Sequence, residues 1–184
     1  EVRGVVCSGD RAFHGPVLLA TGHSARDVYR YLHRAEILIE AKPIAVGVRL
    51  EHPQSLIDEI RYHSPEGRGK YLPAAEYVYK AQAEGRGVYS FCMCPGGFVV
   101  PASTGPEETV VNGMSPANRG SRWANSGLVV ELHPEDIPAT GIRIEDPTSP
   151  LALMQWCEAF EHKSYLAANR SLRAPAQRMT DFVA

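Results

Sequence analysis

Residues 87–132 constrain the fold most strongly, because they form a series of short apolar runs that are each closed by a turn signal. The first two expected strands, 87–94 and 98–102, are separated only by Pro95-Gly96-Gly97, so they are expected to pair as a hairpin. The remaining expected strands lie at 42–50, 109–113 and 127–132. Closely spaced strands joined by turns favour an antiparallel sheet.

Helical patterns flank this strand-rich region. Ser24 is expected to cap a first helix, with Asp27 in its first turn. A second helix is expected after Pro53, and a third from Ser149-Pro150 by the N-cap and N1 preferences. The residues expected to face the core are Leu56, Ile57 and Ile60 in the second helix and Leu153, Cys157 and Phe160 in the third. The sequence therefore predicts an α+β fold, a mainly antiparallel sheet with flanking helices.

The N-terminal part has a different pattern. Residues 17–20 form an apolar run between Pro16 and Gly22 that suits a buried strand, and the first helix follows at once. Backbone N–H groups at such a strand-to-helix turn favour an anionic part of a cofactor, although a plain connection explains the pattern as well. The cofactor-binding candidates are Ala20, Thr21, Gly22, His23 and Ser24. The other six histidines, His14, His33, His52, His63, His133 and His162, are expected at the surface or at caps.

The cysteines at 92 and 94 leave several interpretations open. Residues two apart on a strand share a face, and their Cα atoms lie about 6.5 Å apart, near the upper limit for a disulfide. Cys92 and Cys94 could line a cofactor or pack in the sheet, exchange electrons as a thiol pair, or help to bind a metal. Neither C-x-x-C nor H-x-x-x-H spacing occurs, so we expect no metal site.

A polar segment between the last expected strands could bind an anionic or planar ligand, or could simply be a solvated loop. It contains two arginines beside Trp123, and asparagines at each end. The substrate-side candidates, including the turn glycines, are Gly96, Gly97, Asn112, Arg119, Arg122 and Asn125.

Composition narrows the functional classes. The 184 residues are 44% apolar and 22% charged, with a net charge of −2 and four cysteines. Because no basic run or long apolar run is present, neither a nucleic-acid partner nor a membrane partner is expected. Four cysteines are too few for a disulfide scaffold, so a cytoplasmic location is expected. The G-x-G-x-x-G fingerprint is absent, since the runs Gly67-Arg68-Gly69 and Gly85-Arg86-Gly87 both lack its third glycine.

Five segments together resemble a little-characterised bacterial family of FAD-dependent, or NAD(FAD)-utilising, dehydrogenase flavoproteins. They are VLLATGHSARDVYRYL, KPIAVGVRLEHPQSLID, GVYSFCMCPGGFVVPAST, VVNGMSPANRGSRWANSGLVVEL and APAQRMTDF. The resemblance implies that residues 1–41 end the first FAD-binding half, as an α/β strand–turn–helix remnant, and that 42–184 form an inserted, substrate-side domain. It also implies that Ala20, Thr21 and Gly22 lie against FAD, with His23 and Ser24 next to it. The Cys92–Gly97 hairpin and the Asn112–Asn125 loop are implied to face the flavin.

The expected function is therefore that of a fragment of an FAD-dependent oxidoreductase, inactive by itself. Its expected partners are the rest of its parent chain, an unknown small substrate and NADH or NADPH. Two alternatives are a flavin-binding regulatory or RNA-modification-associated module, and a thiol-redox domain that uses Cys92 and Cys94. Bleaching of bound flavin by NADH or NADPH separates the first alternative from a dehydrogenase, and a reversible disulfide would support the second.

Overall fold

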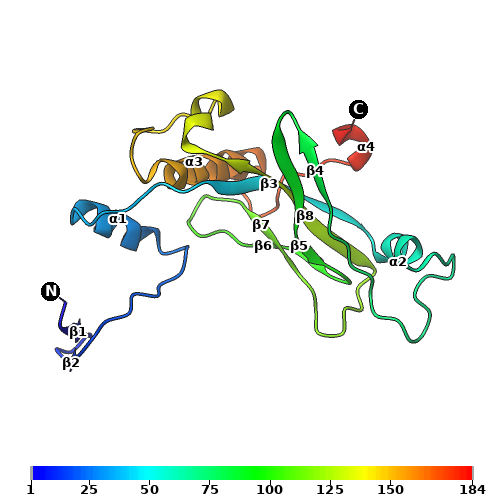
Figure 1. The fold of residues 1–184 in the computed structure, drawn as a ribbon, viewed down its shortest axis with the longest axis horizontal. Coiled ribbons are helices and arrows are strands. Elements are labelled where there is room, and N and C mark those ends of the chain that lie inside the picture. The colour runs from blue at the N-terminus through cyan, green and yellow to red at the C-terminus, as the bar shows by residue number, and fades with distance from the viewer. Residues whose placement is uncertain (1, 184) are drawn as a thin grey trace. The chain divides into compact units, whose positions relative to one another are not determined.

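The computed structural model describes residues 2–183, and it divides into two compact units, one ending at Ile39 and the other beginning at Glu40. The first unit contains a short antiparallel hairpin, β1 (Gly4–Val6) with β2 (Ala12–His14), followed by the helix α1 (Arg26–Arg34) (Figure 1). The roles that we expected for residues 1–41 and 42–184 stay predictions.

Two expectations for the first unit are wrong. Residues 17–20 do not form a strand, and the Leu18 side chain is 89% exposed. A strand needs neighbours for its backbone N–H and C=O groups, and within residues 2–183 this segment pairs with none. Ser24 does not cap α1 either, because the N-cap is Ala25 and the Ser24 hydroxyl lies 3.3 Å from His23 Nε2 instead.

The second unit is built on a four-stranded antiparallel sheet. Its strands are β3 (Ile44–Pro53), β4 (Lys80–Ala83), β5 (Arg86–Cys94) and β8 (Trp123–Leu132). Their order is β3-β8-β5-β4. β8 begins four residues earlier than the sequence predicted, since Trp123 already pairs with Pro53 at the end of β3. Together with the helices, this sheet confirms the predicted α+β fold.

A second, two-stranded sheet pairs β6 (Phe98–Pro101) with β7 (Val111–Met114). The predicted hairpin is therefore wrong, because β5 pairs with β4 and β8, while β6 belongs to the other sheet. Gly96 explains the separation. Its φ is +53°, and its N–H donates to Gln54 Oε1 at 2.7 Å, so this turn is tied to another element instead of closing a hairpin.

The main hydrophobic cluster lies between the sheet and two helical elements, η1 (Pro134–Thr140) and α3 (Ala152–Ala167) (Figure 1). Its buried members are Leu132, Ile137, Ala152, Leu153 and Trp156. Leu153 faces inward as predicted and Cys157 packs against the cluster. Phe160 instead stacks on Trp156 and stays 37% exposed.

The third helix starts later than the sequence predicted. Its N-cap is Leu151, whose N–H donates to the Ser149 hydroxyl at 3.1 Å, so Ser149 closes the turn before the helix.

The helix α2 (Gln54–Tyr62) directly follows β3 and buries an unexpected face. Ile57 is buried as predicted, but Leu56 and Ile60 are exposed, and the other buried residues are Gln54 and Asp58. A final short helix, α4, spans Met179–Phe182. Among the described residues, no helix has the length and apolarity needed to cross a membrane.

Candidate functional site

The first half of β8 places two fully buried polar residues next to each other in sequence. Asn125 and Ser126 are both 0% exposed. Neighbouring residues on a strand point to opposite faces, so each belongs to a different polar group. Burial of polar side chains within a sheet is costly unless they are hydrogen-bonded.

The first group, here called the Arg49 cluster, consists of Arg49, Cys94, Asn112, Gly113 and Asn125. The Arg49 guanidinium is its centre, with Nη1 donating to Asn125 Oδ1 at 2.6 Å and Nη2 to Asn112 Oδ1 at 3.2 Å. These contacts join β3, β7 and β8, so the cluster sits where the two sheets meet.

Glycine makes this close approach possible. A Cβ on Gly113 would lie 2.3 Å from both Arg49 Nη1 and Asn125 Oδ1, and 2.6 Å from Cys94 Sγ. A Cβ on Gly97 would lie 2.6 Å from the Met114 carbonyl oxygen. The cluster therefore excludes larger side chains at two of the glycine positions beside it.

One donor of the cluster is unused. Asn125 Nδ2 is buried and has no hydrogen-bond partner within residues 2–183. Buried amide nitrogens without a partner are uncommon in folded proteins and call for an explanation. The same side chain accepts from Arg49 Nη1 through Oδ1, so this donor lies beside a fixed cation.

The two cysteines of β5 are placed differently from each other. The pairing of β5 with β8 shifts between Phe91 and Cys94, and Cys92 has a φ of +47°. Because of this β-bulge, Cys92 is exposed and Cys94 is buried, so they do not share a face as predicted. Both thiols are free.

Electrostatics also separates the cysteines from a typical reactive pair. Burial raises the pKa of the Cys94 thiol, and the neighbouring Cys92 acts in the same direction, while Arg49 lowers it. The net direction is upward, so Cys94 is held as a neutral thiol at neutral pH. Nucleophilic cysteines usually have lowered pKa values.

The second polar group is on the opposite face and pairs His52 with Tyr77. His52 Nε2 lies 2.7 Å from the Tyr77 hydroxyl, and Nδ1 is buried without a hydrogen-bond partner in the described part of the chain. Burial lowers the pKa of His52 and raises the pKa of Tyr77, so both are neutral near pH 7. A neutral imidazole joined to a phenol can pass a proton in either direction, which makes this pair a candidate for acid–base chemistry.

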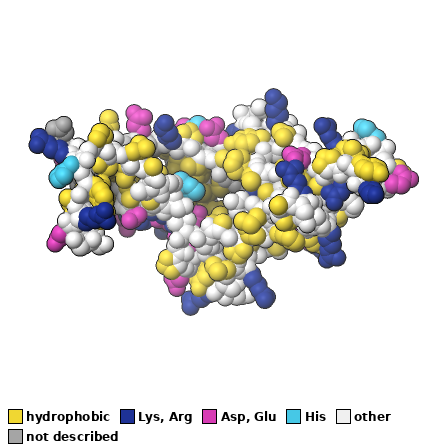
Figure 2. All heavy atoms as spheres, turned by 90° about the horizontal axis from the view of Figure 1, so that it is seen from below, with side chains coloured by type: hydrophobic (Ala, Val, Ile, Leu, Met, Phe, Trp, Pro, Cys, Tyr) yellow, Lys and Arg dark blue, Asp and Glu magenta, His cyan; other side chains and the backbone are white. Residues whose placement is uncertain are grey.

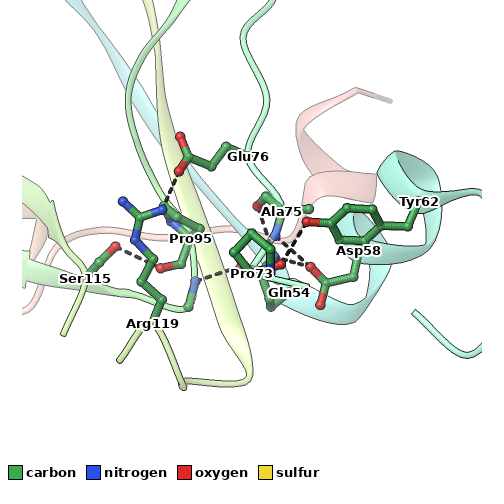
Figure 3. Close-up of polar contacts among 10 residues, drawn as sticks. Gln54, Asp58, Tyr62, Pro73, Ala75, Glu76, Pro95, Ser115 and Arg119 are labelled. Carbon is green, nitrogen blue, oxygen red and sulfur yellow. Dashed lines mark hydrogen bonds and ion pairs between the residues drawn. The ribbon is translucent and has the colours of Figure 1, made fainter. Parts of the chain in front are cut away.

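A buried network behind these groups fixes the surrounding loops (Figure 3). Gln54 Nε2 donates to Asp58 Oδ1 at 2.7 Å and to the Ala75 carbonyl at 3.1 Å. Asp58 Oδ1 also accepts from the Ala75 N–H at 2.8 Å, and Gln54 Oε1 holds Gly96. One helical turn of α2 therefore positions the loop before β4 and the turn after β5.

The predicted substrate-side residues divide between these structures. Asn112 and Asn125 lie in strands and meet at Arg49, and Gly96 and Gly97 lie in the turn beside them. Arg119 instead pairs with Glu76 (Figure 3). The Arg122 guanidinium lies over the Trp123 ring, 4.9 Å from its centre. The predicted polar segment therefore does not form a single group: the asparagines at its ends bind Arg49, whereas its arginines contact Glu76 and Trp123.

The cofactor-binding candidates Ala20, Thr21, Gly22, His23 and Ser24 are in the first unit and are all exposed apart from their own local contacts. Gly22 has a φ of +80°, and a Cβ there would have no neighbour within 4 Å. Their predicted contact with FAD stays a prediction. Across residues 2–183, no three His, Cys, Asp or Glu side chains gather as a metal site requires.

Comparison with known proteins identifies the family of this chain. A family model described as "FAD-dependent protein, C-terminal domain-like" matches residues 43–184. The chain belongs to this family. The match covers the whole second unit except its first residues, so the Arg49 cluster and the His52–Tyr77 pair lie inside the matched domain.

One relative matches both the first and the second unit. An "Uncharacterized protein" of Clostridium beijerinckii (strain ATCC 51743 / NCIMB 8052) is 38% identical over 185 residues, which takes in 100% of this chain. The chain spans 33% of that protein's length. Members of the FAD-dependent family therefore include much longer chains.

Sequence reasoning missed several residues of the site. Arg49 lies within an expected strand, where an arginine reads as an outward-facing side chain. His52 was expected at the surface or at a cap, but it is half-buried against Tyr77. Gln54 is the first residue of α2, in which only apolar residues were expected to face the core. Only the alternation of polar residues with apolar ones in β3 could have marked Arg49.

Proposed function

We propose that this chain is the inserted, substrate-side part of an FAD-dependent oxidoreductase. The observation that carries the proposal is the Arg49 cluster, which holds a half-buried cation in a fixed position within the region that matches the FAD-dependent family. Flavin rings and many redox substrates carry carbonyl oxygens and become more negative on reduction, and such a cation suits that charge. When bound, FAD supplies the electron transfer.

The residues present fit one part of FAD and not the other. The half-buried guanidinium of Arg49 matches the carbonyl edge of a flavin or of a substrate beside it. The adenosine diphosphate part needs a glycine fingerprint at a strand-to-helix turn, and residues 1–184 lack it. That part is accordingly assigned to the remaining length of the longer protein.

The first unit supports the same assignment. Val17, Leu18 and Leu19 are exposed directly before the Ala20-Thr21-Gly22 turn. Exposed apolar residues in an extended segment suit a strand that pairs within a larger sheet. The proposed partner for this segment is the rest of the parent chain, with FAD at the turn.

In this proposal the protein orients and the flavin reacts. Arg49 holds the ligand by hydrogen bonds, and Asn112 and Asn125 keep the guanidinium in place. His52 and Tyr77 hold a proton at Nε2 or at the hydroxyl oxygen for a substrate that gains or loses one. NADH or NADPH is the proposed electron donor, and the substrate is a small molecule.

The thiol-redox alternative has less support. A reversible disulfide needs both sulfur atoms on one side of the strand, and the bulge gives Cys92 and Cys94 different exposure. The raised pKa of Cys94 also disfavours a thiolate. The two cysteines are therefore proposed to line the cluster and not to exchange electrons.

The test is anaerobic reduction of the flavin in the full-length Clostridium beijerinckii relative. The proposal predicts that NADH or NADPH bleaches the absorbance of bound FAD. A protein whose bound FAD is bleached by neither would support a regulatory flavin-binding module and contradict the proposal.

A chimaera in which this chain replaces the matching third of the relative allows Arg49→Lys to be tested in the same assay. Arg143→Lys is the exposed control. We expect about a tenfold or larger loss of reduction rate only for Arg49→Lys.

A further inference from the structure

A groove of about 500 Å³ lies between two loops of the second unit, and it includes none of the residues of the Arg49 cluster. One wall comes from the loop after α2 and the other from the loop between β7 and β8. Its lining residues are Arg68, Gly69, Lys70, Leu72, Pro73, Ala74, Ala117, Asn118 and Arg119. Three of these side chains carry a positive charge.

Each arginine of the groove is held by one carboxylate of the protein. Arg68 Nε lies 3.6 Å from Asp58 Oδ2, and the Arg119 Nη1 group pairs with Glu76 (Figure 3). An arginine has five N–H donors, so one such pair fixes the guanidinium while leaving donors for a ligand. The arginine side chains keep 30% and 45% of their surface exposed, respectively.

Lys70 adds a positive charge that the protein does not balance. Its ammonium lies 5.7 Å from the centre of the Tyr71 ring and, within residues 2–183, forms no ion pair. The groove thus gathers three cations against the two carboxylates of Asp58 and Glu76. Glu66, the remaining carboxylate of this loop, is hydrogen-bonded to the Ser64 hydroxyl at 2.8 Å and does not line the groove.

The walls are held in place before any ligand arrives. Ala74 and Ala75 are only 4% and 3% exposed, and the Gln54–Asp58 network fixes the backbone of Ala75. On the other wall, Asn118 Oδ1 accepts from the Gly120 N–H at 3.1 Å, so its NH₂ group remains to donate. Pre-positioned donors lose little entropy on binding, which favours a specific site over a loose basic surface.

We propose that this groove binds the phosphate of a small phosphorylated ligand, with a nucleotide as the preferred form. Two guanidinium groups, an ammonium and an amide line the groove from its two walls, which suits the several oxygens of a phosphate better than a single carboxylate. The volume accommodates a ligand of nucleotide size, and the apolar residues Leu72 and Pro73 offer a surface for its base. Lys and Arg side chains gather at the end of this unit that carries α2 (Figure 2). The overall charge of −2 disfavours a long nucleic acid.

The test is isothermal titration calorimetry of the 184-residue chain in phosphate-free buffer with ADP, inorganic pyrophosphate and adenosine. We expect ADP to bind and adenosine to bind at least tenfold more weakly. Pyrophosphate that binds as tightly as ADP would identify the phosphates alone as the recognised group, while tighter ADP binding would add recognition of the nucleoside. Adenosine that binds as tightly as ADP, or no binding of ADP or pyrophosphate, would overturn the proposal.

A pair of variants locates the binding. Lys70→Ala is expected to weaken ADP binding about tenfold, and Lys163→Ala, an exposed cation on α3, to change it less than twofold. Equal effects of the two variants would show a general charge effect and contradict the site. Both side chains are exposed, so circular dichroism spectra should match the wild type. The assay needs no flavin, so its result is independent of the proposed oxidoreductase function.

Discussion

The Arg49 side chain compensates for an irregularity in the neighbouring strand. The β-bulge in β5 takes the Cys92 carbonyl out of the ladder with β8, and Arg49 Nη1 donates to that oxygen at 3.1 Å. The same nitrogen donates to Asn125 Oδ1 at 2.6 Å. A single guanidinium thus supplies donors to two acceptors that the sheet leaves unsatisfied, which a lysine could do only in part.

Gly113 is predicted to be the most sensitive small residue of the site. Gly113→Ala would place a methyl group 2.3 Å from Arg49 Nη1 and Asn125 Oδ1, so the cluster must move apart. We expect unfolding free energy to fall by about 1–3 kcal/mol in urea titrations. Gly87→Ala is the matched control in β5, because its nearest neighbour would be Gln82 Nε2 at 3.9 Å. Equal stability losses in the two variants would contradict the tight approach at Gly113.

His52 is predicted to make the stability of the protein depend on pH. Burial lowers its pKa below the ordinary value of 6.5, so the unfolded chain binds the proton more readily than the folded one. The stabilisation is complete above pH 6.5 and decreases as the pH falls toward the lowered pKa. Unfolding free energies measured between neutral and mildly acidic pH should show this loss.

The control for this pH dependence is the exposed residue His14. His52→Gln should flatten the acid side of the stability profile, and His14→Gln should leave it as in the wild type. An unchanged profile in His52→Gln would contradict the assignment to His52.

At the scale of elements, the bulge in β5 predicts different reactivity for its two cysteines. Cys92 is exposed, while Cys94 is buried with a raised pKa. Limited iodoacetamide labelling at neutral pH, read by peptide mass spectrometry, should modify Cys92 at least tenfold faster than Cys94. In denaturant the two rates should become similar. Faster labelling of Cys94 in the folded protein would contradict the bulge geometry.

The sequence predicts which segments become strands better than it predicts their partners. The apolar runs at β3, β5 and β8 are found close to where their patterns indicate. Partner choice depends on tertiary contacts, and the hydrogen bond from Gly96 to Gln54 directs the chain out of the first sheet, which no short-range turn signal reveals. The run at 17–20 shows the converse, a strand pattern without neighbours in residues 2–183.

The candidate site was predictable in part. Asn112, Asn125 and the turn glycines were singled out because polar residues and glycines in a strand-rich region are conspicuous. Arg49 and His52 were not, because their roles depend on pairing with residues 63 positions and 25 positions away, respectively. Sequence spacing carries no direct record of such long-range contacts.

At the scale of the whole molecule, the family and the length of its relative matter together. The chain belongs to an FAD-dependent family and corresponds to 33% of the Clostridium beijerinckii protein. Its second unit provides an internally hydrogen-bonded polar site, and its first unit exposes apolar residues beside a glycine turn. These features are consistent with a domain that completes a flavin site formed largely by other parts of a longer chain.

The most direct measurement is a fluorescence titration of FAD with this 184-residue chain and, in parallel, with the full-length Clostridium beijerinckii relative. The account predicts tight binding by the relative and about a hundredfold or more weaker binding by the chain alone, because the chain lacks the glycine fingerprint for the pyrophosphate. Absence of binding by the relative would contradict the central claim that this domain works with FAD. Tight binding by the chain alone would contradict the assignment of the adenosine diphosphate site to the remaining length of the protein.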